Sequence, residues 1–121
     1  MSRPRRSSDG LRHLALKSRD LRATERFYRD VLGLRRAFDH PGMLFLETPG
    51  ADDLLNFVAT RSAFDPGGGG FDHFGIHIPR ARWKAVQAAL KEAGVKIQAQ
   101  RGRSAVYVED PNGYTVELYI D

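Results

Sequence analysis

Two stretches of the chain repeat one another, and each opens with a histidine at the head of an alternating apolar segment. His13 is followed 43 positions later by Asn56, and His73 is followed 44 positions later by Glu117. Each interval contains an amphipathic helical pattern that ends at a glycine. A repeat in such close register predicts one supersecondary unit used twice. It also carries residue types that bind metals to equivalent places in both copies.

The first copy predicts a strand, a helix and three further strands. Apolar residues alternate over 11–17, which is typical of a half-buried strand. A helix is expected from an N-cap at Asp20 to about Leu32, and Gly33 supplies its C-terminal stop. The three strands that follow are expected at about 35–39, 43–48 and 53–60.

The second copy predicts the same order. A strand is expected at about 72–78, Pro79 suits the entry to a helix, and Gly94 is the helix stop. Strands follow at about 95–99, 103–109 and 114–120. The predicted fold class is therefore α+β, with two βαβββ modules that form a curled mixed sheet around a cleft.

Length and composition favour one domain at residues 11–121. With 121 residues, 41% of them hydrophobic, the chain can bury one core. We expect module one at about 11–60, a glycine-rich linker at about 61–70 and module two at about 71–121. Residues 1–10 carry half of the net charge of +4 and are expected to form a disordered basic tail rather than an arm for nucleic acid.

What the sequence lacks disfavours disulfide-bonded, membrane-spanning and secreted proteins. The chain has no cysteine, so disulfides and thiolate metal sites are excluded, and a reducing cytoplasm is the expected location. No apolar run is long enough to span a bilayer, and no secretory signal is apparent. We expect neither a membrane nor a nucleic acid as partner.

Strand alternation places the candidate ligands on one face of the predicted sheet. His13, His73 and Glu117 each lie opposite the apolar face of their strand, and so does Asn56. Any one of these histidines would be unremarkable on a solvent-facing sheet. Two imidazoles and one carboxylate at equivalent positions instead favour one divalent metal, either Fe, Mn, Ni, Co or Zn, with positions left open for substrate or water.

These motifs resemble the vicinal oxygen chelate superfamily, which includes glyoxalase I, fosfomycin-resistance proteins, extradiol dioxygenases and bleomycin-resistance proteins. The resemblance covers nearly all of residues 11–121 and is most specific at 13–16, 27–34 and 109–118. It implies paired βαβββ modules around a metal cleft with His13, His73 and Glu117 as ligands. It also implies a homodimer whose sites are shared between chains.

The departures from the family pattern leave the reaction open. Glyoxalase I has a glutamate ligand where this chain has Asn56, and a neutral amide cannot act as a general base. Asn56 is then a candidate fourth ligand or substrate contact. Fosfomycin-resistance enzymes place a lysine and serines where this chain has Ile97, Arg101 and Ala105, and the acid–base histidine of extradiol dioxygenases has Gln98 as its nearest counterpart.

Several other residues are candidates for the same cleft. Tyr107 is the candidate catalytic hydrogen-bond or proton donor beside Glu117, unless it is a tyrosine of the rim. His77 lies about 13 Å along the strand from His73, too far to share a metal ion, and either lines the cleft or is structural. The basic residues Lys17, Arg101 and Arg103 would favour an anionic substrate, unless they are simply solvated.

Two functions remain open from the sequence. The first is a divalent-metal-dependent enzyme that chelates a small oxygenated substrate, of the dioxygenase, lyase, isomerase or thiol-transferase type. The second is a metal-free module that binds a small molecule or antibiotic, as bleomycin-resistance proteins do.

Overall fold

The computed structural model of the protein describes residues 5–121 and contains the first predicted module in full. Its elements are β1 (His13–Ser18), α1 (Leu21–Leu32), β2 (Arg35–His40), β3 (Met43–Glu47) and β4 (Leu54–Ala59). The four strands form one sheet in the order β1-β4-β3-β2. β1 runs parallel to β4, and the other neighbours are antiparallel.

The second module repeats this arrangement. Its elements are β5 (Phe74–His77), a 3-10 turn η1 (Arg80–Arg82), α2 (Trp83–Glu92), β6 (Ile97–Arg101), β7 (Ala105–Glu109) and β8 (Thr115–Tyr119). The strand order β5-β8-β7-β6 matches that of the first sheet, again with one parallel pair, β5 and β8. The prediction of two βαβββ modules is confirmed, and each module has its own four-stranded mixed sheet.

The ends of the helices follow from their capping residues. The Asp20 carboxylate accepts a hydrogen bond from the Ala23 N–H at 3.0 Å, which caps α1 as expected. Gly33 ends α1 in the left-handed conformation, with φ of 72°. The second helix differs from the prediction at its start, because a 3-10 turn separates Pro79 from Trp83.

The core lies between the helices and one face of each sheet. The alternating burial of β3 and β8 shows that every second side chain points into this layer. On the first sheet Phe57 packs against Tyr28 of α1, with ring centroids 5.5 Å apart. Across both modules seven large apolar side chains are almost completely buried: Tyr28, Leu46, Phe57, Leu90, Val108, Val116 and Leu118. The opposite face of each sheet carries polar side chains such as Asn56 and Glu117, beside apolar ones such as Phe45.

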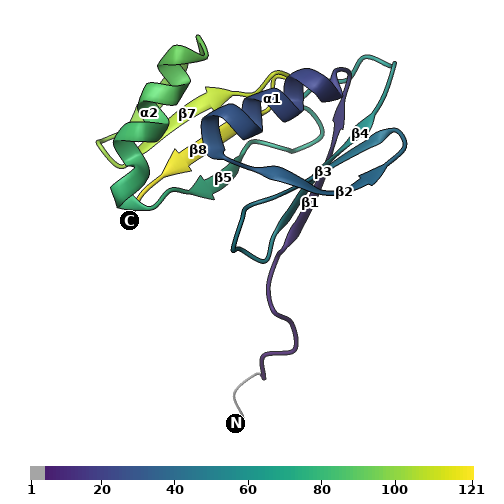
Figure 1. Cartoon of the computed structure of the whole chain (residues 1–121), viewed down its shortest axis with the longest axis horizontal. Coiled ribbons are helices and arrows are strands. Elements are labelled where there is room, and N and C mark those ends of the chain that lie inside the picture. Colours follow the sequence, from purple (N-terminus) through teal and green to yellow (C-terminus); the bar gives the residue numbers. More distant parts are fainter. Residues whose placement is uncertain (1–4) are drawn as a thin grey trace.

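Helix α1 connects the two modules. In Figure 1 it crosses in front of β7 and β8, although it belongs to the first module. The Tyr28 hydroxyl donates a hydrogen bond of 2.8 Å to Asp110, which lies in the turn between β7 and β8. From the same turn the Tyr114 hydroxyl accepts a hydrogen bond from the Lys17 N–H and donates one to the Lys17 carbonyl, at 3.0 and 2.8 Å. These bonds hold the second module against β1 and α1.

The connecting segments contain no regular structure. The predicted linker at 61–70 forms neither helix nor strand, and two of its glycines, Gly69 and Gly70, have positive φ. Of the predicted tail, residues 1–4 lie outside the described residues, and 5–10 form neither helix nor strand. Among residues 5–121 no helix has the length and apolar character needed to cross a membrane.

Candidate metal centre

The first pair of candidate residues lies on the polar face of the first sheet, meaning the face opposite the helices. β1 pairs with β4 so that Ala15 lies beside Asn56, and the His13 ring reaches across to the Asn56 amide. Asn56 Oδ1 and His13 Nε2 are in hydrogen-bond contact. Asn56 is only 3% exposed, whereas His13 is exposed. The contact therefore satisfies a buried amide oxygen with a ring nitrogen that solvent or a partner can reach.

The second pair lies on the corresponding face of the second sheet. His73 immediately precedes β5, and Glu117 lies in β8 beside Gly75. His73 Nε2 and Glu117 Oε1 are 3.1 Å apart. Two ligands at about 2.1 Å from one divalent metal, bound at right angles to each other, would be about 3.0 Å apart. The spacing of this pair suits two adjacent ligands of one metal ion.

Each member of the second pair is held by a further charged residue. The Asp72 carboxylate accepts a hydrogen bond from His73 Nδ1 at 2.5 Å, which leaves Nε2 directed toward Glu117. The other oxygen of Glu117 accepts a bond of 2.8 Å from Arg101. Metal-binding histidines usually donate their second N–H to a carboxylate or a carbonyl, so the Asp72 contact is typical of such a ligand.

The same contacts shift the pKa values of both groups. The hydrogen bond to Asp72 raises the pKa of His73 above its usual value, and the bond to Glu117 adds to this. The pKa of Glu117 is lowered, first by its hydrogen bond with Arg101 and then by His73. Glu117 is thus held ionised, as a carboxylate ligand must be.

Tyr107 stands beside this pair. It faces Glu117 directly across β7 and β8, and its ring lies edge-on to that of His73, with centroids 5.5 Å apart. The side chain is partly buried. Its pairing with Glu117 and its contact with His73 place the ring on the polar face of the sheet, as the alternation in the sequence leads one to expect.

The candidate ligands form two pairs on two sheets. Within residues 5–121 no three His, Cys, Asp or Glu side chains are placed to share one metal ion. His13 and His73 nevertheless border the same groove of about 400 Å³, together with Leu14, Leu34 and Leu54. The convergence of His13, His73 and Glu117 stays a prediction.

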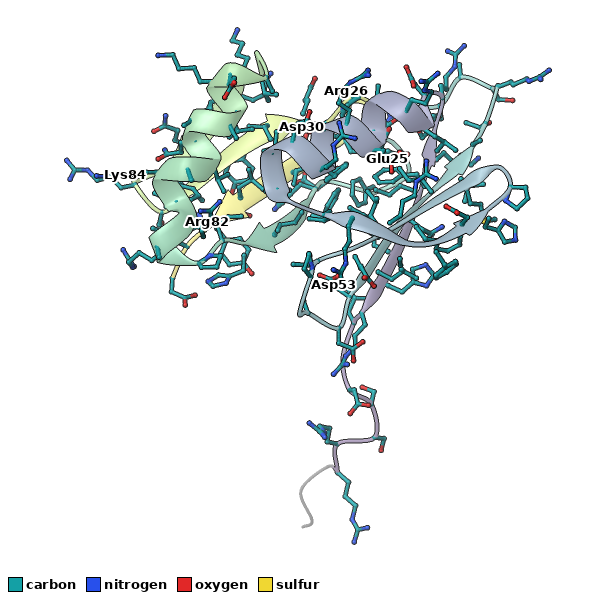
Figure 2. The ribbon with its side chains drawn as sticks, in the orientation of Figure 1. Glu25, Arg26, Asp30, Asp53, Arg82 and Lys84 are labelled. Atoms are coloured by element: carbon teal, nitrogen blue, oxygen red, sulfur yellow. The ribbon has the colours of Figure 1, made fainter. Side chains whose placement is uncertain are left out.

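The remaining candidates lie in different surroundings. Lys17 shares the polar face of β1 with His13 and is exposed. His77 contacts Asp121 at 3.0 Å and borders a hollow of about 830 Å³ between α1, α2 and β5. Figure 2 shows Asp30 and Arg82 on the helical elements that border this hollow. Arg103 borders another hollow, beside Trp83 of the second helix.

The sequence pattern alone gives Asp72 no role, although its contact with His73 fixes the ring. The one available signal was a carboxylate immediately before the histidine. Nor does the pattern reveal that, among the described residues, Arg101 is the one of the three basic candidates that contacts Glu117. That contact reaches from the edge strand β6 past β7 to β8, which strand alternation within one segment does not reveal.

The match of the chain to a family model identifies its group of proteins. Residues 10–118 match the model of the Glyoxalase/Bleomycin resistance protein/Dioxygenase superfamily. The chain belongs to this superfamily.

The chain is similar to a curated relative, the biphenyl-2,3-diol 1,2-dioxygenase 3 of Rhodococcus globerulus. The two are 32% identical over 124 aligned positions, which include 92% of this chain and 63% of the dioxygenase. The chain thus spans less than two thirds of the length of that relative.

Solved structures of low sequence identity share the fold. A glyoxalase/dioxygenase from Nostoc punctiforme is 21% identical, with a TM-score of 0.79 over 100% of this chain and 97% of that one. The fosfomycin resistance protein FosX from Mesorhizobium loti is 19% identical, with a TM-score of 0.73 over 94% and 93% of the two chains. At this identity the likeness concerns the fold alone.

Proposed function

We propose that this protein is a divalent-metal-dependent enzyme that chelates a small oxygenated substrate through His13, His73 and Glu117. The observation that carries the proposal is the 3.1 Å spacing between His73 Nε2 and Glu117 Oε1. The donor set of two imidazoles and one carboxylate suits Fe, Mn, Ni, Co or Zn and leaves coordination positions open. Membership of a superfamily that includes glyoxalases and dioxygenases supports the proposal.

The chain's own residues have distinct parts in this proposal. When bound, the metal would act as a Lewis acid toward vicinal oxygens of the substrate and stabilise negative charge that develops on them. Asp72 accepts from His73 Nδ1, so that Nε2, once it has lost its proton, would be the nitrogen that holds the metal. Tyr107, beside His73, donates a hydrogen bond or a proton to the substrate. Asn56 orients His13 or contacts the substrate, since its amide cannot remove a proton.

We further propose that two copies of the chain form a homodimer, in which His13 of one copy joins His73 and Glu117 of the other. Two features support this arrangement. The ligand pairs lie on different sheets, with no group of three within the described part of the chain. In addition, His13 is exposed and the His73 side chain is 33% exposed, so both are accessible to a second copy.

Metal analysis tests the proposed function. Protein purified without oxygen should contain about one divalent metal per chain, and His73→Ala should lose nearly all of it. His40→Ala is the matched control, because His40 is the last residue of β2 and its ring lies beside the Pro41 carbonyl and edge-on to Phe45, neither of which is a candidate ligand. Metal-free wild-type protein that also fails to bind added metal would overturn the proposal.

The identity of the metal would narrow the reaction. Iron would favour oxygen chemistry of the kind named in the Rhodococcus globerulus relative. Nickel, zinc, cobalt or manganese would favour isomerase, lyase or thiol-transfer chemistry. Screening for activity should therefore follow with the native metal restored.

A metal-free binding protein is the second candidate, and one observation favours it. The contact between His13 and Asn56 satisfies both groups without a metal. On this hypothesis the cleft traps a small molecule, and chelators change neither the melting temperature nor ligand binding. A fall in melting temperature on addition of a chelator would exclude it.

A further inference from the structure

The candidate metal centre has a cationic side chain in direct contact with one of its ligands. Arg101 is the last residue of the edge strand β6, yet its Nη2 lies 2.8 Å from Glu117 Oε2. The two partners are unequally exposed, at 57% for the Arg101 side chain and 14% for that of Glu117. One end of the guanidinium is thus fixed on a shielded carboxylate while the rest faces solvent.

The guanidinium has donors to spare for a ligand. Arginine carries five N–H groups. One nitrogen meets Glu117, and Nη1 is 3.5 Å from the Ser104 hydroxyl, a contact at the limit of hydrogen bonding. The guanidinium is thereby positioned on the polar face of the sheet, next to where a substrate would bind.

The charges of the centre are unbalanced once it holds a metal. Arg101 and Glu117 carry opposite single charges that cancel each other. A divalent cation on Glu117 would therefore leave an excess of two positive charges beside the guanidinium. Asp72 offsets little of it, because its side chain is 92% exposed and lies on the far side of the His73 ring. A neutral substrate would leave this excess in place, whereas an anionic one would neutralise it.

We propose that Arg101 determines specificity for a substrate that carries a carboxylate or phosphonate group in addition to its two chelating oxygens. The inference rests on the proposed function, since the chelating oxygens require the metal. Guanidinium is suited to this role because its planar N–H pairs bind carboxylates and phosphonates with two parallel hydrogen bonds. Lys17 and Arg103 lack any comparable contact with Glu117 in the described residues.

Binding of two matched probes tests the inference without relying on activity. Acetohydroxamate and malonomonohydroxamate present the same chelating oxygens, and the second adds a carboxylate. Their dissociation constants are measured by calorimetry on the cobalt-loaded protein at fixed ionic strength, with the visible spectrum of cobalt confirming that each probe binds the metal. Wild type should prefer the carboxylate probe by about tenfold, as expected for one charge-assisted pair.

Three variants complete the experiment. Arg101→Gln should bring the preference to about one, and Arg101→Lys should retain part of it because the charge is kept. Arg103→Gln is the matched control, since Arg103 lies beside Trp83 in another hollow, and its preference should equal that of wild type. If Arg101→Gln keeps the wild-type preference, or if wild type shows no preference, the inference about Arg101 is overturned. The proposed function is not affected by either result. Failure of the protein to bind cobalt would overturn the proposed function and with it this inference.

Discussion

At the scale of single residues, Glu117 is a candidate ligand held by contacts on both of its oxygens. One of its oxygens faces His73 and the other faces Arg101, so the carboxylate is both ionised and fixed in orientation. The His73 ring is fixed in the same way from its far side by Asp72. Strand alternation predicted which face these side chains occupy. It could not predict the contacts of Asp72 and Arg101, because these depend on rotamers and on strands distant in sequence.

Substitution of Asp72 tests the proposed metal centre and leaves its three candidate ligands unchanged. Asp72→Ala should weaken metal binding by about tenfold or more, because the His73 ring loses the acceptor that holds its tautomer. Asp72→Asn should have a smaller effect, since the amide oxygen still accepts from Nδ1. The measurement is a competition titration against a metal-binding dye.

The control for this titration is Asp30→Asn, which neutralises an exposed carboxylate of α1 (Figure 2). It should leave the affinity of the metal unchanged. An Asp72→Ala protein with the affinity of wild type would show that the contact with His73 does not support a metal ligand.

At the scale of elements, the turn between β7 and β8 joins the modules through a buried carboxylate. Asp110 is 5% exposed and accepts hydrogen bonds from the Tyr28 hydroxyl and from the backbone N–H groups of Asn112 and Tyr114. Burial nevertheless raises the pKa of Asp110 above its ordinary value of 3.8. The Asp-Pro-Asn-Gly sequence at 110–113 is typical of such a turn. The packing of the turn against α1 was not predictable, because it joins residues 82 positions apart.

The raised pKa of Asp110 predicts a pH dependence of stability. The folded state binds this proton more tightly than the unfolded state, so ionisation of the carboxyl favours unfolding. The penalty is absent well below pH 3.8 and complete above the raised folded pKa. As pH rises through this window, the free energy of unfolding of wild type should fall relative to that of Asp110→Asn. Urea denaturation at a series of pH values measures the difference.

The informative quantity is how the difference in free energy of unfolding between wild type and Asp110→Asn changes with pH. Its absolute size is not informative, because Asp110→Asn also changes hydrogen bonds that do not depend on pH. A difference that is constant with pH, or one that moves in favour of wild type as pH rises, would contradict the assignment. Asp30→Asn again serves as the reference for an exposed carboxylate.

At the scale of the whole molecule, the repeat in the sequence specified the architecture well. The positions of helices and strands follow from hydrophobic period, the Asp20 cap and the stop at Gly33, all of which are local signals. The relative placement of the two sheets is not local. It depends on how α1 packs against the β7–β8 turn, and it leaves the His13 pair and the His73 pair on separate sheets.

Mixing two defective variants is the most direct test of a metal centre shared between chains. His13→Ala and His73→Ala, each carrying a different affinity tag, are produced together, and the heterodimer is isolated and analysed for metal. Neither homodimer should hold metal at its centres, because each lacks one ligand at both. The heterodimer should hold one metal, because one of its two centres combines an intact His13 with an intact His73 and Glu117. A heterodimer as metal-free as the two homodimers would contradict the account.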